Sequence, residues 1–313
     1  MLGPPSTFRV GLILTERCGA GCAHCWFGCE AEKGATITIE YAQDYIDMIT
    51  GVPTIEWLSV TGGEPMLYPN LVEGVVAYAS GRGLRTELVT NCWWAKSPAK
   101  AIGTLRRLSD AGLDVLNISA DDFHQASIPF ERVKVCFDAA KGLGLKIIVM
   151  TTVGRTSRIR LADVSRLLGE EIPAPRDVDP AVHFAIGVES PFTPVGKAAL
   201  LPREEWVVGA EPLSGGCNLV LRDLGLRPDG EVLPCCSAAA TLPGFGIGNL
   251  NDARLEELLA TAWKVDVFRT LRERGPMGLL ERPPADYVNK CHLCYEVLSG
   301  TLESIRTMQD RNR

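Results

Sequence analysis

Residues 8–25 read FRVGLILTERCGAGCAHC, an apolar run of β type that leads directly into three cysteines, Cys18, Cys22 and Cys25. Three thiolates on one short loop can hold three irons of a four-iron cluster and leave the fourth iron without a protein ligand. An iron with an open position is reactive. The stretch therefore predicts a buried strand whose carboxyl end carries a reactive metal site.

Zinc and disulfide bonds are the alternatives for this loop. Zinc sites normally close with four ligands in paired C-x2-C or C-x2-H units, whereas this loop has the spacing C-x3-C-x2-C. His24 and Cys29 keep a zinc site open as an alternative. The chain has 11 cysteines, an odd number, and residues 1–7 do not resemble a signal peptide. We therefore expect a cytoplasmic protein whose cysteines bind metal or react as thiols.

Composition indicates a compact protein with one large core and a smaller appended one. The chain has 313 residues, of which 46% are hydrophobic and 22% charged. Its net charge is -6 and it has no long basic run, so we expect no nucleic-acid partner. No apolar run approaches the roughly 20 residues that a membrane span needs, so no membrane association is expected.

Apolar runs of β type alternate with helical patterns along the first two thirds of the chain. Strands are predicted at residues 8–14, 56–61, 84–90, 115–119, 146–152 and 182–187. This alternation predicts an α/β fold with parallel strands and crossover helices. In barrels of this kind the site lies at the carboxyl ends of the strands.

Two motifs at such strand ends resemble those of the radical S-adenosylmethionine (SAM) family. The first is the cysteine loop, and the second is Gly62-Gly63-Glu64-Pro65, which follows the predicted strand 56–61. The resemblance implies a partial (βα)6 TIM-like barrel over residues 1–200. It also implies that Cys18, Cys22 and Cys25 hold a 4Fe-4S cluster that binds SAM, with His24 packed near the adenine.

The resemblance extends to the other residues expected to bind SAM. Two glycines let the backbone approach a ligand, Glu64 can accept a hydrogen bond from an ammonium group, and Pro65 fixes the loop exit. Cys92 replaces the glycine of the family's T-N-G turn, which leaves the backbone geometry there in doubt. The expected SAM-binding residues are His24, Gly62, Gly63, Glu64, Pro65, Asn91, Ser119, Asp121 and Glu189.

Two further polar residues follow the fourth predicted strand. Asp122 and His124 are candidates to face the substrate as a proton acceptor or hydrogen-bond partner. The alternative is a capped loop exposed to solvent, because loops at strand ends are commonly polar.

The cysteines return in residues 201–313, which resemble the auxiliary-cluster domain called twitch, a truncated form of the SPASM pattern. The domain is expected to be small and α+β, with a hairpin at residues 224–233 and a helix at residues 251–272. The resemblance implies one auxiliary 4Fe-4S cluster held by Cys217, Cys235, Cys291 and Cys294, with a structural zinc as the alternative.

Cys236 directly follows one of these ligands. Some radical SAM epimerases carry a cysteine beside an auxiliary-cluster ligand, and its thiol returns a hydrogen atom to a carbon radical. A small buried apolar residue is the alternative role for Cys236.

The resemblance implies a chemistry as well as a fold. Reduction of the first cluster cleaves SAM to a 5′-deoxyadenosyl radical, which abstracts hydrogen from a natural-product substrate, either an aminoglycoside-type sugar or a ribosomal peptide. Epimerisation through Cys236 is the favoured reaction, with dehydrogenation or thioether and crosslink formation as alternatives. A flavodoxin or ferredoxin-type reductant is the expected partner. A non-enzymatic electron carrier or a zinc-stabilised binding scaffold is the remaining hypothesis.

Overall fold

The computed structural model describes residues 6–177, 179, 183–209, 211–280 and 286–311. Six strands alternate with helices in its first part, as predicted. The strands are β1 (Arg9–Thr15), β2 (Trp57–Gly62), β3 (Arg85–Thr90), β4 (Val115–Ser119), β5 (Lys146–Val153) and β6 (Ala185–Pro191). The helices are α1 (Ile39–Thr50), α2 (Pro69–Gly81), α3 (Pro98–Asp110), α4 (Asp122–Gln125), α5 (Phe130–Gly142) and α6 (Leu161–Leu168).

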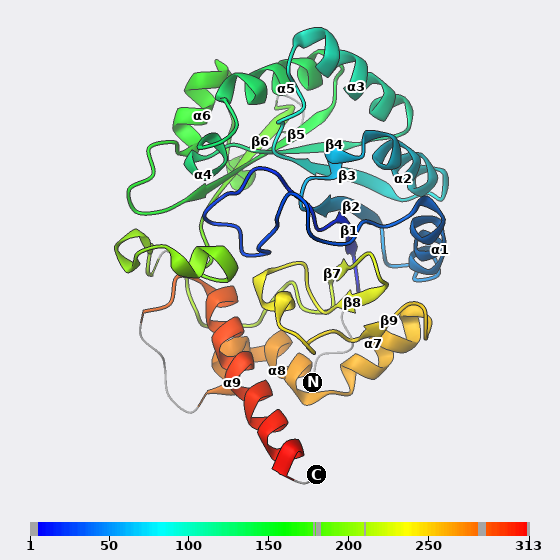
Figure 1. Cartoon of the computed structure of the whole chain (residues 1–313), viewed down its shortest axis with the longest axis vertical. Helices are drawn as coiled ribbons and strands as arrows, with labels where there is room; N and C mark the ends of the chain where they lie inside the picture. The colour runs from blue at the N-terminus through cyan, green and yellow to red at the C-terminus, as the bar shows by residue number, and fades with distance from the viewer. Residues whose placement is uncertain (1–5, 178, 180–182, 210, 281–285, 312–313) are drawn as a thin grey trace.

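These six strands pair in parallel in the order β6-β5-β4-β3-β2-β1, and the helices lie around the outside of the sheet (Figure 1). The sheet is the partial barrel that the sequence predicts. Since successive residues of a strand point to opposite faces, every second side chain faces the barrel interior. The carboxyl ends of all six strands, and the loops that follow them, meet at one end of the barrel.

The bounds of β6 differ from the prediction. The predicted strand 182–187 began outside the described residues and ended early, whereas β6 continues through Glu189 and Ser190 to pair Pro191 with Val153 of β5. The prediction followed the apolar run alone. The ladder continues because strand pairing depends on the partner's length, which a single segment does not reveal.

The C-terminal part contains β7 (Asp223–Leu226), β8 (Glu231–Leu233), β9 (Gly248–Asn249), α7 (Leu255–Trp263), α8 (Asp266–Arg274) and α9 (Lys290–Arg311). The hairpin of β7 and β8 is confirmed, and Gly230 has the positive φ, +88°, that its turn requires. The prediction of one helix over 251–272 is wrong, because Val265 is extended and separates α7 from α8.

The hairpin joins the barrel sheet. β7 pairs in parallel with β1, so one nine-stranded sheet runs from β6 to β9 (Figure 1). The Arg9 guanidinium links the two strands at their starts, with its Nε 2.9 Å from Asp223 Oδ1. The C-terminal region is therefore continuous with the barrel through hydrogen bonds, and it closes the side of the barrel next to β1.

Candidate active site

A cavity of about 350 Å3 lies where the strand ends, the cysteine loop and the C-terminal hairpin meet. We call it the barrel cavity. It collects residues from distant parts of the chain, as expected for a site at the carboxyl ends of parallel strands. The predicted site residues that line it are Cys18, Cys22, His24, Cys25, Gly62, Gly63, Glu64, Asn91, Ser119, His124, Cys235 and Cys236.

The cysteine loop surrounds its thiols with hydrogen-bond donors. The Asn91 side-chain nitrogen lies 3.8 Å from Cys18 Sγ, and the backbone N–H of Ala20 donates to the same sulfur over 3.5 Å. A hydrogen bond from the Cys29 thiol, with backbone N–H donors of the same loop, lowers the pKa of Cys25 to about 5. Burial raises the pKa of Cys18 to about 11, although the N–H of Ala20 opposes this shift. Metal ligation requires the thiolate form, which the hydrogen-bond donors favour. The loop fits a thiolate-bound cluster.

The two glycines of the second motif bring this loop against the chain that leads to the cysteines. A Cβ on Gly62 would lie 2.3 Å from the Thr15 carbonyl oxygen, and one on Gly63 would lie 2.1 Å from the Arg17 carbonyl oxygen. The Gly63 N–H donates to the Thr15 carbonyl over 2.7 Å. The glycines are thus needed for contact with the protein's own backbone, a reason that the sequence analysis did not give.

Glu64 is buried and accepts three hydrogen bonds. They come from the Thr90 hydroxyl at 2.8 Å, the Asn91 N–H at 2.9 Å and the Met66 N–H at 3.1 Å. Burial raises the pKa of Glu64 to about 7 despite these bonds. Pro65 opens the short helical turn Pro65–Leu67 and is buried, outside the cavity lining.

The Thr90-Asn91-Cys92 turn has the geometry that a glycine would supply. Cys92 is fully buried and has φ +64°, in the left-handed region. The replacement of glycine by cysteine therefore leaves the turn conformation in place, at a cost in backbone strain. This conformation lets Asn91 line the cavity beside Cys18.

Asp121 holds His124 at the cavity wall. The His124 Nδ1 lies 2.9 Å from Asp121 Oδ2, and the Thr152 N–H donates to the same carboxylate over 3.2 Å. Burial lowers the pKa of His124, but the Asp121 hydrogen bond and Cys22 together raise it to about 10. Asp121 itself is fully buried and does not line the cavity, so it acts through His124.

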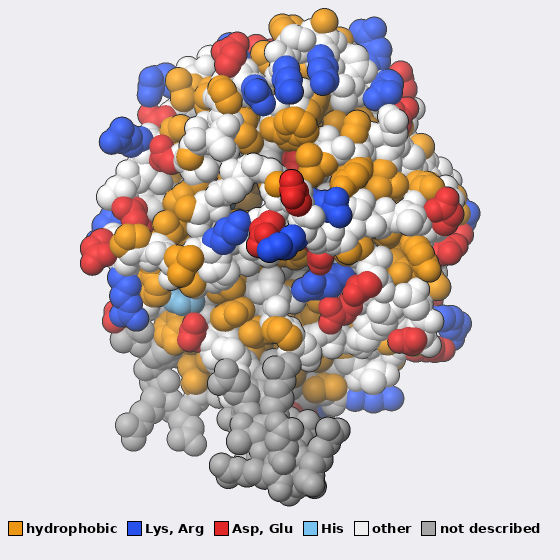
Figure 2. Space-filling view, viewed as in Figure 1, with side chains coloured by type: hydrophobic (Ala, Val, Ile, Leu, Met, Phe, Trp, Pro, Cys, Tyr) orange, Lys and Arg blue, Asp and Glu red, His pale blue; other side chains and the backbone are white. Residues whose placement is uncertain are grey.

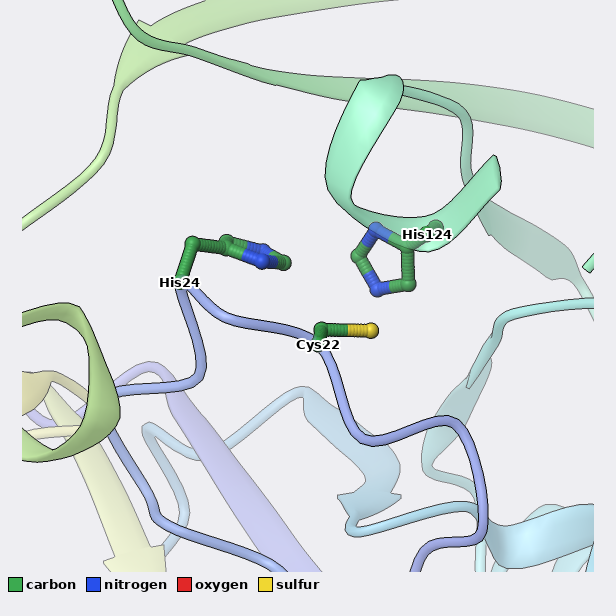
Figure 3. Close-up of side chains that lie close together, drawn as sticks. All are labelled: Cys22, His24 and His124. Carbon is green, nitrogen blue, oxygen red and sulfur yellow. The ribbon is translucent and has the colours of Figure 1, made fainter. Parts of the chain in front are cut away.

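Figure 3 shows the Cys22 sulfur beside the ring of His124, with the ring of His24 nearby. Ligand atoms of these three residues lie within 4.8 Å of one another, a spacing found for no other set of His, Cys, Asp and Glu side chains among the described residues. The His24 ring stacks on Phe123 with the ring centres 4.7 Å apart. His24 thus lies beside the cysteine loop with its ring packed against Phe123.

The structure places Asp122 and Glu189 away from this cavity. Asp122 Oδ2 accepts from the backbone N–H groups of Arg158 and Ile159 at 2.6 and 3.0 Å. Glu189 Oε2 accepts from the Leu161 N–H at 2.8 Å. Neither carboxylate lines the barrel cavity, and both fix the loop that enters α6. The alternative of a capped loop residue describes Asp122.

The four C-terminal cysteines lie near one another, and one of them, Cys235, lines the cavity. Burial raises the pKa of Cys235, and the nearby thiols of Cys291, Cys294 and Cys217 raise it further. A single zinc would hold its sulfurs about 3.8 Å apart, from Zn–S bonds of about 2.3 Å. Among the described residues no three of these sulfurs all lie within 4.8 Å of one another. These sulfurs are therefore further apart than in a closed zinc site.

Cys236 faces the barrel interior on the side of the hairpin. A Cβ on Gly11 of β1 would lie 2.7 Å from Cys236 Sγ, so the thiol occupies the space that a side chain at Gly11 would fill. The Cys236 N–H donates to the Asp223 carbonyl over 2.7 Å. Burial raises the pKa of Cys236 to about 12, and the Asp223 carboxylate adds to the shift. Cys236 and the three cysteines of the loop thus line one cavity.

Some residues that shape the site had no site role assigned from the sequence. Lys197 holds the cysteine loop, because its Nζ donates to the Cys29 carbonyl over 2.6 Å and its N–H to the Cys25 carbonyl over 3.1 Å. Inside the barrel, Glu87 accepts from the Asn117 side chain over 2.8 Å. The available signal was an acidic residue in the middle of an apolar strand, since such residues are seldom buried without a partner.

Acidic and basic side chains lie side by side over the middle of the face in Figure 2, which presents no broad basic area there. Within the described part of the chain, no helix has the length and apolar character needed to cross a bilayer.

Known proteins match both parts of the chain. A family model described as the radical SAM superfamily matches residues 12–164, and one described as the SPASM iron-sulfur cluster-binding domain matches residues 217–295. YydG of Bacillus subtilis, whose assignment to peptide biosynthesis is provisional, is 22% identical over 236 residues, covering 74% of this chain and 69% of its own. The PqqA peptide cyclase of Methylocella silvestris is 24% identical over 303 residues, covering 83% and 76%.

A solved structure has the same architecture. The crystal structure of BtrN in complex with AdoMet and 2-DOIA matches with a TM-score of 0.54 at 13% identity and covers 92% of each chain. At this level of identity the likeness shows the fold. It agrees with a partial barrel followed by an antiparallel C-terminal region.

Proposed function

Because the chain belongs to the radical SAM superfamily and carries a C-terminal iron-sulfur cluster-binding domain, we propose that it epimerises a residue of a peptide substrate, with Cys236 as hydrogen-atom donor. The observation that carries the proposal is the position of Cys236. Its thiol lines the same cavity as Cys18, Cys22 and Cys25, on the hairpin side of the barrel.

The residues on the cavity wall suit the expected cofactors. Cys18, Cys22 and Cys25 would hold the SAM-binding 4Fe-4S cluster, and Cys217, Cys235, Cys291 and Cys294 would hold the auxiliary one. His24, Gly62, Gly63, Glu64, Asn91 and Ser119 would bind SAM; all of them line the barrel cavity. When bound, these cofactors supply a 5′-deoxyadenosyl radical that can remove hydrogen from an unactivated C–H bond.

The protein's own part in the reaction is to hold the substrate and to return a hydrogen atom. As the Cys236 S–H bond breaks, a C–H bond forms at the substrate carbon on the face toward the thiol, and a sulfur-centred radical remains. One electron from a flavodoxin or ferredoxin-type reductant and one proton restore the thiol. His124 stays in the proposal as a residue facing the bound molecules, and Asp121 orients it.

Asp122 is not part of the proposed reaction, because its carboxylate binds two backbone N–H groups outside the cavity. Glu189 is left out of the SAM-binding set for the same kind of reason.

A peptide is favoured over an aminoglycoside-type sugar by the sequence relatives. The PqqA peptide cyclase is named for a peptide substrate and matches 83% of this chain. BtrN is solved with the small molecule 2-DOIA, but its likeness supports the fold alone. Dehydrogenation, with the auxiliary cluster as electron acceptor, is the second candidate, because Cys235, one of the four proposed ligands of that cluster, lines the cavity.

The first experiment tests the radical chemistry. Anaerobically reconstituted protein with SAM and dithionite should release 5′-deoxyadenosine, and a Cys22→Ala variant should release none. The absence of 5′-deoxyadenosine from the parent protein would contradict the radical function and leave the electron-carrier or scaffold hypothesis.

The second experiment tests the role of Cys236. In deuterated water the parent should add one deuteron to the product, because the thiol exchanges with solvent. Cys236→Ala should still cleave SAM but add no deuteron. Full deuterium gain in this variant would exclude Cys236 as donor, and a product that has lost one H2 would indicate dehydrogenation instead.

A further inference from the structure

One buried acceptor on the wall of the barrel cavity has no hydrogen-bond donor. Asn117 of β4 is 9% exposed and lines the cavity. Its Nδ2 donates to Glu87 over 2.8 Å, but no group of the described residues donates to its Oδ1. An unpaired buried acceptor costs about 1–3 kcal/mol, and a position that retains one calls for an explanation.

The hydrogen bond to Glu87 fixes the orientation of the Asn117 amide. An ionised Glu87 can only accept, so the amide nitrogen must face it. Glu87 is itself held, because its second oxygen lies 3.2 Å from the Arg9 guanidinium, which also binds Asp223. The Asn117 oxygen therefore cannot exchange places with the nitrogen without leaving Glu87 unpaired.

Along the strands, Asn117 lies between the level of Gly11, which contacts the Cys236 thiol, and that of Ser119, one of the predicted SAM-binding residues. Gly11, which contacts the thiol, is level with Ser59 and then Glu87 across β1, β2 and β3. Asn117 lies two residues beyond Val115, the partner of Glu87, and Ser119 lies two residues further toward the cavity mouth. A substrate carbon that loses hydrogen on the side of the SAM site and gains it from the Cys236 thiol would lie near the level of Asn117.

Val89, the residue of β3 that pairs with Asn117, is apolar. Val89 of β3, Met150 of β5 and Leu233 of β8 also line the cavity. A peptide residue with an apolar side chain presents one backbone N–H and otherwise apolar surface, which suits a single acceptor among apolar neighbours.

We propose that Asn117, oriented by Glu87, is a specificity-determining residue whose Oδ1 accepts the backbone N–H of the peptide residue that reacts. This contact selects a peptide substrate and turns the Cα–H bond of that residue along the line between the SAM site and Cys236. The inference rests on the proposed epimerase function.

The test uses a chemical change in the substrate together with a change in the protein. The probes are pools of capped nonapeptides with one amino acid fixed at the centre, and matched pools N-methylated at that residue. Reconstituted parent, Asn117→Leu and Thr151→Val are compared by deuterium gain and by KM and kcat. Thr151 is the matched control, because it is buried on the neighbouring strand with an unpartnered hydroxyl and lies outside the cavity.

Removal of the hydrogen bond, by N-methylation of the peptide or by substitution of Asn117, should raise KM by the same factor. N-methylation should raise KM for the parent about tenfold, the size of one hydrogen bond. Asn117→Leu should raise KM for the unmodified peptide by a similar factor, and N-methylation should then cost little more. Thr151→Val should leave KM unchanged, and the parent and Thr151→Val should both release 5′-deoxyadenosine in the absence of peptide.

The outcomes separate this inference from the proposed function. Deuterium gain in no peptide pool, with SAM still cleaved, would refute peptide epimerisation and the inference with it. Deuterium gain with equal KM for N-methylated and unmodified pools would refute the inference alone. Since that comparison uses the unaltered protein, it decides the matter even where Asn117→Leu does not fold.

Discussion

At the scale of single residues, the site depends on a glycine and on one unusual backbone conformation as well as on its functional side chains. Gly11 leaves room for the Cys236 thiol inside the barrel, and the left-handed Cys92 keeps the turn that presents Asn91 to the cavity. Each of these positions is set by a neighbour far away in the sequence. Their roles depend on contacts with distant residues, which the local sequence does not predict.

Gly11→Ala should separate the thiol from its substrate. Because the new Cβ would lie 2.7 Å from Cys236 Sγ, the thiol must turn or shift. We expect 5′-deoxyadenosine release to continue and deuterium gain in the product to fall at least tenfold, measured by mass spectrometry. Gly142→Ala is the matched control, since nothing lies within 4 Å of its Cβ position. Equal deuterium gain in both variants would show that Cys236 is not the donor.

Glu64 should make the apoprotein less stable as the pH rises. Burial raises the pKa of Glu64 from 4.5 to about 7 in the folded state, so folding favours the protonated form. This stabilising contribution is fully present below pH 4.5 and is lost as the pH rises through about 7. At about 1.4 kcal/mol per unit of pKa difference, the free energy of unfolding falls by up to about 3 kcal/mol. Urea unfolding from pH 5 to 8 measures it. Glu64→Gln should flatten the dependence, and an unchanged slope would exclude Glu64 as its source.

At the scale of elements, the sequence located the strand ends that carry the site. The alternation of apolar runs and helical patterns predicted six parallel strands, and the cysteine loop and Gly62-Gly63-Glu64-Pro65 were found at two of their ends. The inner face of the barrel was not predicted. Asn117 and Glu87 meet only through the register of β3 and β4, and no pattern within one strand reveals which residues of another lie beside it.

Gly63→Ala should detach this loop from the chain leading to the cysteines. A Cβ there would lie 2.1 Å from the Arg17 carbonyl oxygen, which is backbone and cannot give way as a flexible side chain would. We expect weaker SAM binding by isothermal calorimetry, by at least tenfold, with the auxiliary cluster still formed. Gly103→Ala on the exposed face of α3 is the control and should be neutral or stabilising by about 1 kcal/mol. Normal SAM affinity in Gly63→Ala would contradict the assigned contact.

At the scale of the whole molecule, the N-terminal and C-terminal groups of cysteines are attached to one continuous β-sheet. The predicted boundary near residue 200 divides the chain by function, yet β7 pairs with β1 and the sheet continues across the division. That pairing lies outside what the sequence could show, because a hairpin signal defines its own two strands and not the strand beside them. It brings Cys235 and Cys236 to the barrel cavity.

Cys294→Ser should remove one cluster and leave the other. Reconstituted parent should hold about eight irons per chain, and the variant about four, since a four-iron cluster of this kind uses four cysteines. The remaining cluster should still change its electron paramagnetic resonance spectrum when SAM is added. Zinc in place of iron at this site, found by elemental analysis of anaerobically purified protein, would overturn the cluster assignment.

The pairing of β1 with β7 also leaves one edge of β1 unpaired during synthesis of the chain. Arg9 and Asp223 are partners 214 residues apart, so β1 leaves the ribosome long before the strand that covers its second edge. At about 5–20 residues per second the delay is roughly 10–40 s. Through that interval an apolar strand keeps an open edge on which other nascent chains can add. Expression at low temperature with abundant chaperones should therefore raise the soluble yield more than any change to the mature surface.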